Sequence, residues 1–170
     1  FVLDNSGIDI KDVTHIAIPR DTSANQFHKI KYVALNPIGG ISAAFEHFRR
    51  SKDSLSFIEK LGEIFNIDHL EITAEIISVE HHLAHISSSY FTSPFKELTA
   101  GFSYDGSGDF VSMMAARCEG NQINVIDKVR LPHSIGFFYT ALCQFIGFDH
   151  FGEEYKVMGL AAYGEDNYSD

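Results

Sequence analysis

Two histidines four residues apart are the first candidates for chemistry in this sequence. His81 and His85 lie in the stretch VEHHLAHISSSY, residues 79–90, directly after an apolar run. On a helix, residues four apart share one face, with Cβ atoms roughly 5–6 Å apart, so one divalent cation can bridge both imidazoles. His82 falls on another face and is predicted to pack or to support the ligands. The alternative is that the two imidazoles are only hydrogen-bonded.

These histidines do not match the zinc-protease signature. That signature requires a glutamate directly after the first histidine, and His82 occupies this position. Protease chemistry is therefore not predicted.

A carboxylate in a glycine-rich stretch is the second candidate. In SYDGSGD, residues 103–109, Asp105 is predicted at the tip of a strand and precedes Gly106 and Gly108. Glycines let the backbone approach an anion closely, so this turn can hold phosphate. The alternative is a plain hairpin, for which Asp-Gly is a strong signal. Two imidazoles and one carboxylate together suit Fe(II), Zn(II) or Mn(II), with positions left for a substrate oxygen.

The third candidate is GEEYKVMGLAAYG, residues 152–164. Glu154 and Lys156 offer charges, and Gly159 permits close approach, so the three are candidates to face a nucleotide. Judged on spacing alone, an ordinary amphipathic helix is the favoured alternative.

Strands and helices alternate along the chain and must position these residues. The first part is predicted to begin with the last turn of a helix closed by Gly7, followed by a buried strand over 13–18 that is ended by Pro19 and a polar loop over 19–29. Next are expected a strand or the entry to a helix over 31–35 and two helices within 40–65. A strand over 75–79 then leads to a helix that begins at the histidines and stops at Pro94. The second half is predicted to be a meander of strands over 98–106, 109–120 and 122–131, followed by helices over 134–148, capped by Ser134, and over 154–164. This order favours an α/β or α+β domain with one mixed sheet.

Composition narrows the functional classes. The 170 residues carry 13 Lys and Arg against 23 Asp and Glu, a formal net charge of −10, which disfavours binding to a phosphate backbone. The short basic cluster at 49–52 is predicted to be a solvated helix end. Cys118 and Cys143 form no CxxC pattern, and no apolar run is long enough to cross a bilayer. A cytoplasmic protein is expected, and both chain ends suggest a piece of a longer one.

The motifs together resemble a known family. VEHHLAHISSSYF, FSYDGSGD, SIGFFYTALCQFIGF and GEEYKVMGLAAYG, in this order, are similar to the NodU/CmcH family of O-carbamoyltransferases, and the resemblance extends back to DNSGIDIKDVTHIAI. It covers nearly the whole chain. One departure is Ala162, where many relatives carry proline.

The resemblance implies a fold and a reaction. The fold would be part of a Kae1-like domain of the actin/hexokinase-like ATPase superfamily, with a YrdC-like domain elsewhere in the full-length protein. Family members make carbamoyl-adenylate from carbamoyl phosphate and ATP, then transfer the carbamoyl group to a substrate hydroxyl with the help of a bound metal, usually iron.

The resemblance also implies roles for individual residues. The metal ligands carried over are His81, His85 and Asp105, and a further family aspartate lies beyond this sequence. Gly106 and Gly108 would contact phosphate. The residues near the nucleotide would be Glu154, Lys156 and Gly159.

Other functions remain open at this point. Kae1-like relatives include enzymes of tRNA threonylcarbamoyl transfer and of hydrogenase maturation, although the acidic balance disfavours a tRNA substrate. A sugar kinase would not need two helix histidines. The isolated segment is expected to be inactive while the parent protein is an enzyme acting on a small-molecule hydroxyl acceptor; the acceptor and a homodimeric state are left open.

Overall fold

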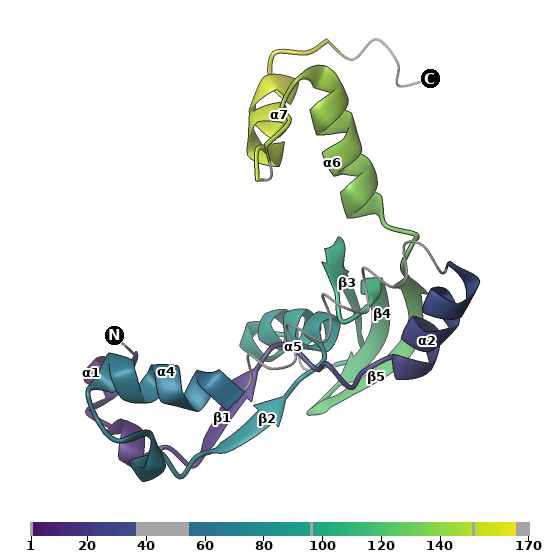
Figure 1. Cartoon of the computed structure of the whole chain (residues 1–170). Coiled ribbons are helices and arrows are strands. Elements are labelled where there is room, and N and C mark those ends of the chain that lie inside the picture. Colours follow the sequence, from purple (N-terminus) through teal and green to yellow (C-terminus); the bar gives the residue numbers. More distant parts are fainter. Residues whose placement is uncertain (1, 37–54, 96, 151, 166–170) are drawn as a thin grey trace. The chain divides into compact units, whose positions relative to one another are not determined.

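The computed structural model describes residues 2–36, 55–95, 97–150 and 152–165, which form a mixed α/β structure (Figure 1). The chain divides into two compact units, Phe1–Ala84 and His85–Asp170. The helices are α1 (Val2–Ser6), α2 (Gln26–Leu35), α4 (Leu55–Phe65), α5 (His81–Thr92), α6 (Ile135–Ile146) and α7 (Glu154–Ala161). The strands are β1 (His15–Ile18), β2 (Glu75–Ser78), β3 (Thr99–Gly108), β4 (Val111–Glu119) and β5 (Gln122–Arg130).

In the first unit, β1 and β2 form a parallel two-stranded sheet with Ile16 opposite Ile76. Both strands were predicted, the first from its β-branched run, and both are confirmed. The expectation that β1 is buried is wrong, because its residues alternate between exposed and half-buried. The core of this unit lies around the buried residues Ile10, Ile72 and Ala74.

The structure corrects the predicted loop over 19–29 and describes only part of the predicted helices within 40–65. The predicted polar loop over 19–29 is too long, because α2 begins at Gln26 and continues through 31–35 as a helix. No proline or glycine interrupts residues 26–35, so nothing opposes a helix there. Of the two helices predicted within 40–65, the second is confirmed as α4. The first, and the basic cluster at 49–52, lie outside the described residues.

The second unit contains the predicted antiparallel meander, with strand order β3-β4-β5. The described strands therefore form two sheets, one parallel and one antiparallel, and the expectation of one mixed sheet is wrong. The β3–β4 turn also lies later than predicted. Asp109 and Phe110 both have positive φ, at 51° and 73°, and Gly108 still pairs with Val111. These values match the two-residue turn whose twist suits a hairpin.

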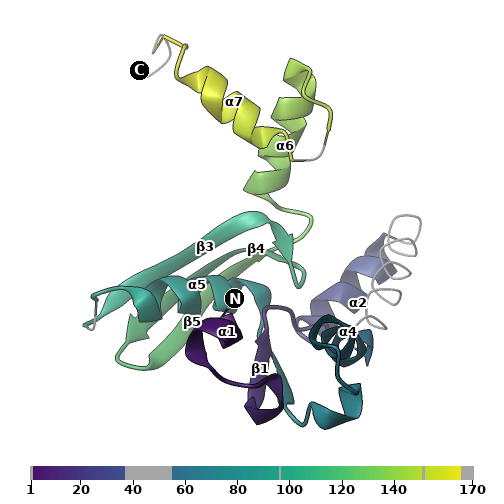
Figure 2. The same ribbon diagram turned by 90° about the vertical axis from the view of Figure 1, so that its left-hand side faces the viewer.

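Helix α5 packs on one face of this sheet (Figures 1 and 2). Its buried stripe includes Ile86 and Tyr90, which are 1% and 6% exposed. A Cβ added at Gly101 on β3 would lie 2.8 Å from Ile86 Cγ2, so glycine at this position lets helix and strand approach closely. A cavity of about 230 Å³ remains between them, beside Tyr90 and Cys118.

Helices α6 and α7 follow the sheet (Figure 1). The predicted Ser134 cap is confirmed: the Ser134 hydroxyl accepts a hydrogen bond from the Phe137 amide at 3.1 Å. Gly147 ends α6 in the left-handed conformation with φ 110°. In the described ranges, every helix is too short or too polar to cross a membrane.

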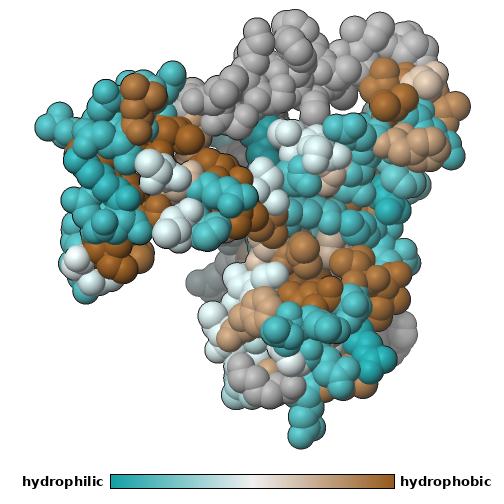
Figure 3. Space-filling view, turned by 90° about the horizontal axis from the view of Figure 1, so that it is seen from below, coloured by the Kyte–Doolittle hydropathy of each residue, from teal (hydrophilic) through white to brown (hydrophobic). Residues whose placement is uncertain are grey.

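Some apolar side chains face solvent, as the brown areas in Figure 3 illustrate. On β3, Phe102 and Tyr104 are 65% and 72% exposed, and they alternate with the buried Ser103. They therefore lie on the sheet face opposite the one that α5 covers.

Candidate metal centre

The first turn of α5 presents the two predicted histidine ligands. Strand β2 ends at Ser78, and α5 begins three residues later at His81, with the Glu80 carbonyl accepting the first helical hydrogen bond from the Ala84 amide at 2.9 Å. The strand-to-helix prediction for this stretch is confirmed. His81 and His85 thus lie one helical turn apart, with their side chains on one face.

Asp105 lies opposite this helix face, on β3. The β3–β4 register is regular as far as Tyr104, which pairs with Met113, and shifts between Tyr104 and Gly108. Asp105 therefore sits in an irregular part of β3, and not at the strand tip where it was predicted. Its Oδ2 lies 3.5 Å from His85 Nε2. A bulge of this kind redirects a side chain out of the regular alternation.

The three predicted ligands come together. One ligand atom from each of His81, His85 and Asp105 lies within 4.8 Å of the other two. Atoms bonded to one ion at about 2.0–2.2 Å can be up to about 4.4 Å apart, so small side-chain adjustments suffice for shared coordination. Two imidazole nitrogens and one carboxylate oxygen form a donor set that fits Fe(II), Zn(II) or Mn(II). The residues present therefore fit a divalent metal.

A backbone carbonyl holds the His81 ring. His81 Nδ1 lies 3.3 Å from the Pro19 carbonyl oxygen, which follows β1. An N–H at Nδ1 that donates to this carbonyl makes Nε2 the ring atom that can bind a cation, which is the usual arrangement of metal-bound histidines.

His82 packs as predicted. It is completely buried, and its ring meets the His81 ring edge to face, with centroids 5.4 Å apart. Its neighbours on the buried stripe are Ile86 and Tyr90, at helical spacing. His82 therefore contributes to packing and to the placement of His81.

The two glycines after Asp105 have close neighbours. The Gly106 carbonyl accepts a hydrogen bond from the Ser134 hydroxyl at 2.7 Å, and a Cβ at Gly106 would lie 3.0 Å from the Phe137 ring. Gly108 pairs with Val111 beside the turn. Gly106 thus allows α6 to approach β3, and the contact of both glycines with phosphate stays a prediction.

The three predicted nucleotide-facing residues lie together on α7. The Glu154 carboxylate accepts a hydrogen bond from the Thr140 hydroxyl at 2.8 Å, which joins α7 to α6. The Lys156 ammonium pairs with Glu153, and this hydrogen bond raises the pKa of Lys156. Outside its own helix turn, a Cβ at Gly159 would meet no atom of the described residues within 4 Å. Contact between these residues and a nucleotide stays a prediction.

Replacing Thr140 by valine is expected to raise the pKa of Glu154. A hydrogen bond from its own backbone amide and then the one from Thr140 hold this pKa below the ordinary glutamate value. The associated stability is present above the unfolded-state pKa and is lost as the pH falls through the lower folded-state pKa. Thr140→Val should therefore shrink the difference in stability between neutral and acid pH. NMR titration of the Glu154 carboxyl measures the shift.

Thr92→Val is the matched control, because the Thr92 hydroxyl bonds a backbone carbonyl, that of Ser88, at 2.7 Å on α5. An unchanged Glu154 titration in Thr140→Val would show that the hydroxyl does not bond this carboxylate in solution.

Sequence reasoning missed a second group of donor atoms. Asp149, His150 and Glu153 offer ligand atoms within 4.8 Å of one another in the turn before α7. The sequence signal for this group is the spacing D-H-x-x-E over residues 149–153. The Glu153 carboxylate already accepts hydrogen bonds from Lys156 and from the His150 amide, so a cation there would compete with the Lys156 ammonium.

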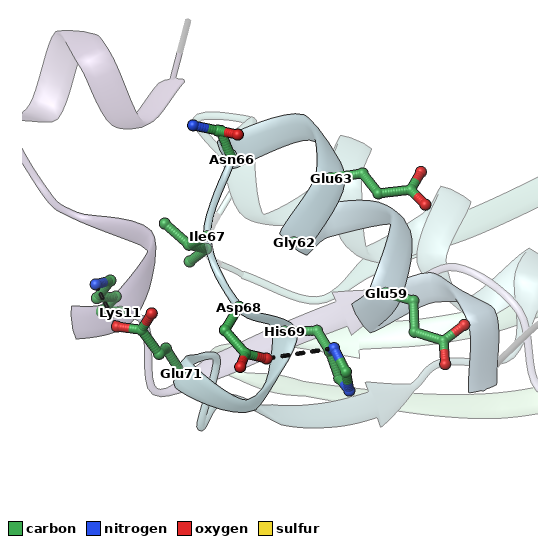
Figure 4. A pocket seen from close by; sticks show the side chains of 9 residues that line it. All are labelled: Lys11, Glu59, Gly62, Glu63, Asn66, Ile67, Asp68, His69 and Glu71. Atoms are coloured by element: carbon green, nitrogen blue, oxygen red, sulfur yellow. Dashed lines mark hydrogen bonds and ion pairs between the residues drawn. The ribbon is translucent and has the colours of Figure 1, made fainter.

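A polar pocket of about 740 Å³ lies in the first unit (Figure 4). None of the predicted site residues lines it. Lys11 pairs with Glu71 at its edge, and His69 Nδ1 lies 3.5 Å from Asp68 Oδ1. The other lining residues are Glu59, Gly62, Glu63, Asn66 and Ile67.

Comparison with known proteins gives a consistent result. The model of the family described as carbamoyltransferase N-terminus matches residues 1–169. An uncharacterized protein of Synechocystis sp., sll1178, is 31% identical over 176 residues, which is 100% of this chain and 28% of that protein. An uncharacterized protein of Methanocaldococcus jannaschii, MJ1051, is 34% identical over 82% of this chain and 24% of its own length.

A third relative has a name that refers to nodulation. Nodulation protein NolO of Bradyrhizobium diazoefficiens is 37% identical over 93 residues, which cover 54% of this chain and 17% of that protein. The chain thus spans less than a third of the length of each of these three relatives.

Proposed function

Because the chain belongs to the carbamoyltransferase N-terminus family, we propose that the intact protein is an O-carbamoyltransferase that acts on a hydroxyl of a sugar or secondary metabolite. The observation that carries this proposal is the convergence of His81, His85 and Asp105 in a chain matched almost end to end by that family. The name of the nodulation relative agrees with the resemblance to the NodU/CmcH family.

The proposed reaction begins from carbamoyl-adenylate, which forms from carbamoyl phosphate and ATP with release of phosphate and pyrophosphate. A carbamoyl carbon is a poor electrophile because its nitrogen donates electron density into the carbonyl. Adenylation provides a good leaving group. The acceptor oxygen then bonds to the carbamoyl carbon, the bond from that carbon to the phosphate oxygen breaks, and AMP leaves with the bonding electrons, while the hydroxyl proton is released.

The proposed role of the three converging residues is to hold a divalent metal, for which we propose Fe(II). The metal would supply Lewis-acid polarisation of the carbamoyl carbonyl. His81 and His85 provide neutral nitrogen donors on a rigid helix turn, and Asp105 provides a negative oxygen donor from β3. Holding both imidazoles on one turn of α5 keeps that part of the site preorganised, which favours stabilisation of charge that develops during the reaction.

The proposed architecture follows the same resemblance. We propose that the described α/β elements are part of a Kae1-like domain of the actin/hexokinase-like ATPase superfamily, and that a YrdC-like domain of the same protein makes the carbamoyl-adenylate. Gly106 and Gly108 would contact phosphate. Glu154, Lys156 and Gly159 would lie near the nucleotide.

The proposal is tested by incubating the intact protein with carbamoyl phosphate, ATP and candidate sugars. Mass spectrometry should detect carbamoyl-adenylate and a carbamoylated acceptor, and both should vanish when ATP is omitted. If carbamoyl-adenylate never forms, the proposal fails. If the protein instead modifies tRNA in the presence of threonylcarbamoyl-adenylate, the activity is that of the alternative Kae1-like class.

A further inference from the structure

The loop between β1 and α2 contacts the start of α5 at two points. This loop, residues 19–25 and hereafter the 19–25 loop, contributes the Pro19 carbonyl 3.3 Å from His81 Nδ1. It also contributes the Asn25 amide, whose Nδ2 donates to Glu80 Oε1 at 3.1 Å. A backbone hydrogen bond from Val79 N to Ile18 O, at 2.9 Å, joins the segments that lead into both contacts. The loop therefore contacts both His81, the first proposed metal ligand, and Glu80, the residue directly before it.

Asn25 departs from its usual role in a way that favours this contact. It is the N-cap residue of α2, where an asparagine side chain normally accepts a hydrogen bond from the first helical turn. Here it makes no such capping bond and has φ 59°, in the left-handed region. Its side chain is instead directed to Glu80, 55 residues further along the chain. A local preference given up in favour of a distant contact is typical of functional sites.

Hydrogen bonds within the 19–25 loop and from α2 stabilise the loop. Asp21 Oδ1 accepts hydrogen bonds from the Ser23 amide at 2.8 Å and the Ser23 hydroxyl at 2.6 Å. The Lys29 ammonium, on α2, donates to the Thr22 carbonyl at 2.9 Å. These contacts stabilise the loop. They therefore help to keep the Pro19 carbonyl, an acceptor, and the Asn25 amide, a donor, in place beside the start of α5.

We propose that Asn25 and Glu80 are positioning residues for His81. Glu80 directly precedes His81, and its carbonyl accepts the first hydrogen bond of α5. The Asn25–Glu80 bond fixes the entry of the helix, and the Pro19 carbonyl then selects the orientation of the imidazole. The Asn25 and Glu80 side chains are not proposed to touch the metal. The inference rests on the metal site of the proposed function and adds the residues that orient it.

The test uses variants of the intact protein and cobalt(II) as the probe. Asn25→Gly deletes the donor while still permitting a positive φ. Asn25→Asp places two carboxylates together. The double variant Asn25→Asp with Glu80→Gln restores the hydrogen bond in the reverse direction, because the glutamine amide donates to the new carboxylate. Asn66→Gly is the matched control, since Asn66 also has a positive φ, 53°, and lines the polar pocket of the first unit.

Both single Asn25 variants should bind cobalt about 10-fold more weakly, the lower end of the loss expected for an outer partner of a metal ligand, because Asn25 acts on His81 through Glu80. They should also change the visible ligand-field spectrum of the bound cobalt. The double variant should recover most of the affinity, and Asn66→Gly should bind as the wild type does. Wild-type affinity and spectrum in Asn25→Gly would overturn the inference while leaving the metal site intact.

Nitrogen-15 NMR of the metal-free protein separates this inference from the metal site. The His81 ring should show a proton fixed on Nδ1 in the wild type and in the double variant, and a mixture of tautomers in Asn25→Gly. If the wild type binds no cobalt, the proposed metal site fails. In that case a changed His81 tautomer in Asn25→Gly would still support the positioning role, and an unchanged tautomer would overturn it.

Discussion

His85→Ala is expected to remove tight binding of a divalent metal by the intact protein. The substitution deletes one of the three donors that converge at this site and also removes the partner 3.5 Å from Asp105 Oδ2. Loss of a direct ligand should reduce affinity by more than the roughly 10–100-fold that loss of an outer partner costs. Cobalt titration followed by visible absorption measures the change, and elemental analysis of the purified protein measures the loss of bound metal.

His69→Ala is a matched control for this prediction. His69 is also a partly exposed histidine 3.5 Å from a carboxylate, that of Asp68, but it belongs to no group of three converging donors in the described residues. Metal content should therefore be unchanged in His69→Ala. Equal metal content in wild type and His85→Ala would show that bound metal lies elsewhere in the protein.

Gly136→Ala is expected to damage both folding and the candidate metal centre. A Cβ at Gly136, in the first turn of α6, would lie 2.5 Å from the carbonyl carbon and oxygen of Asp105 and 2.6 Å from the Gly106 amide nitrogen. These are backbone atoms, so the helix or β3 must move. Overpacking of this kind costs about 1–3 kcal/mol. Because the clash is with Asp105 itself, metal affinity should fall together with the free energy of unfolding.

Gly159→Ala provides the comparison for this substitution. Gly159 is also a helix glycine, on α7, but in the part of the chain that the structure describes its added Cβ meets no atom beyond its own helix turn within 4 Å. Alanine favours the helix over glycine by up to about 1 kcal/mol, so Gly159→Ala should keep or raise stability. Urea unfolding of both variants decides the outcome. A Gly136→Ala protein with wild-type stability and metal content would show that α6 does not dock on Asp105 as described.

The histidine pair and its helix could be predicted because the signals are local. Apolar residues at helical spacing after a β-branched run indicated α5, and a spacing of four placed His81 and His85 on one face. The burial of His82 also follows from that periodicity. The family resemblance seen in these motifs is confirmed by the match to residues 1–169.

The surroundings of the histidines could not be predicted in the same way. Asp-Gly at 105–106 signalled a turn, but the chain turns at Asp109 and Phe110, which adopt positive φ without glycine. Asp105 consequently lies in an irregular stretch of β3, and its approach to His85 depends on how α5 packs against the sheet. The contact from Asn25 to Glu80 joins residues 55 positions apart, so no local pattern carries it.

His81, His85 and Asp105 are proposed to bind one divalent metal ion. Anomalous diffraction at the metal absorption edge, from crystals of the intact protein loaded with iron or cobalt, tests it directly. We expect one strong peak at about 2.0–2.2 Å from an imidazole nitrogen of each histidine and from a carboxylate oxygen of Asp105. A peak at other residues only, or three side chains that remain apart with no peak between them, would contradict it.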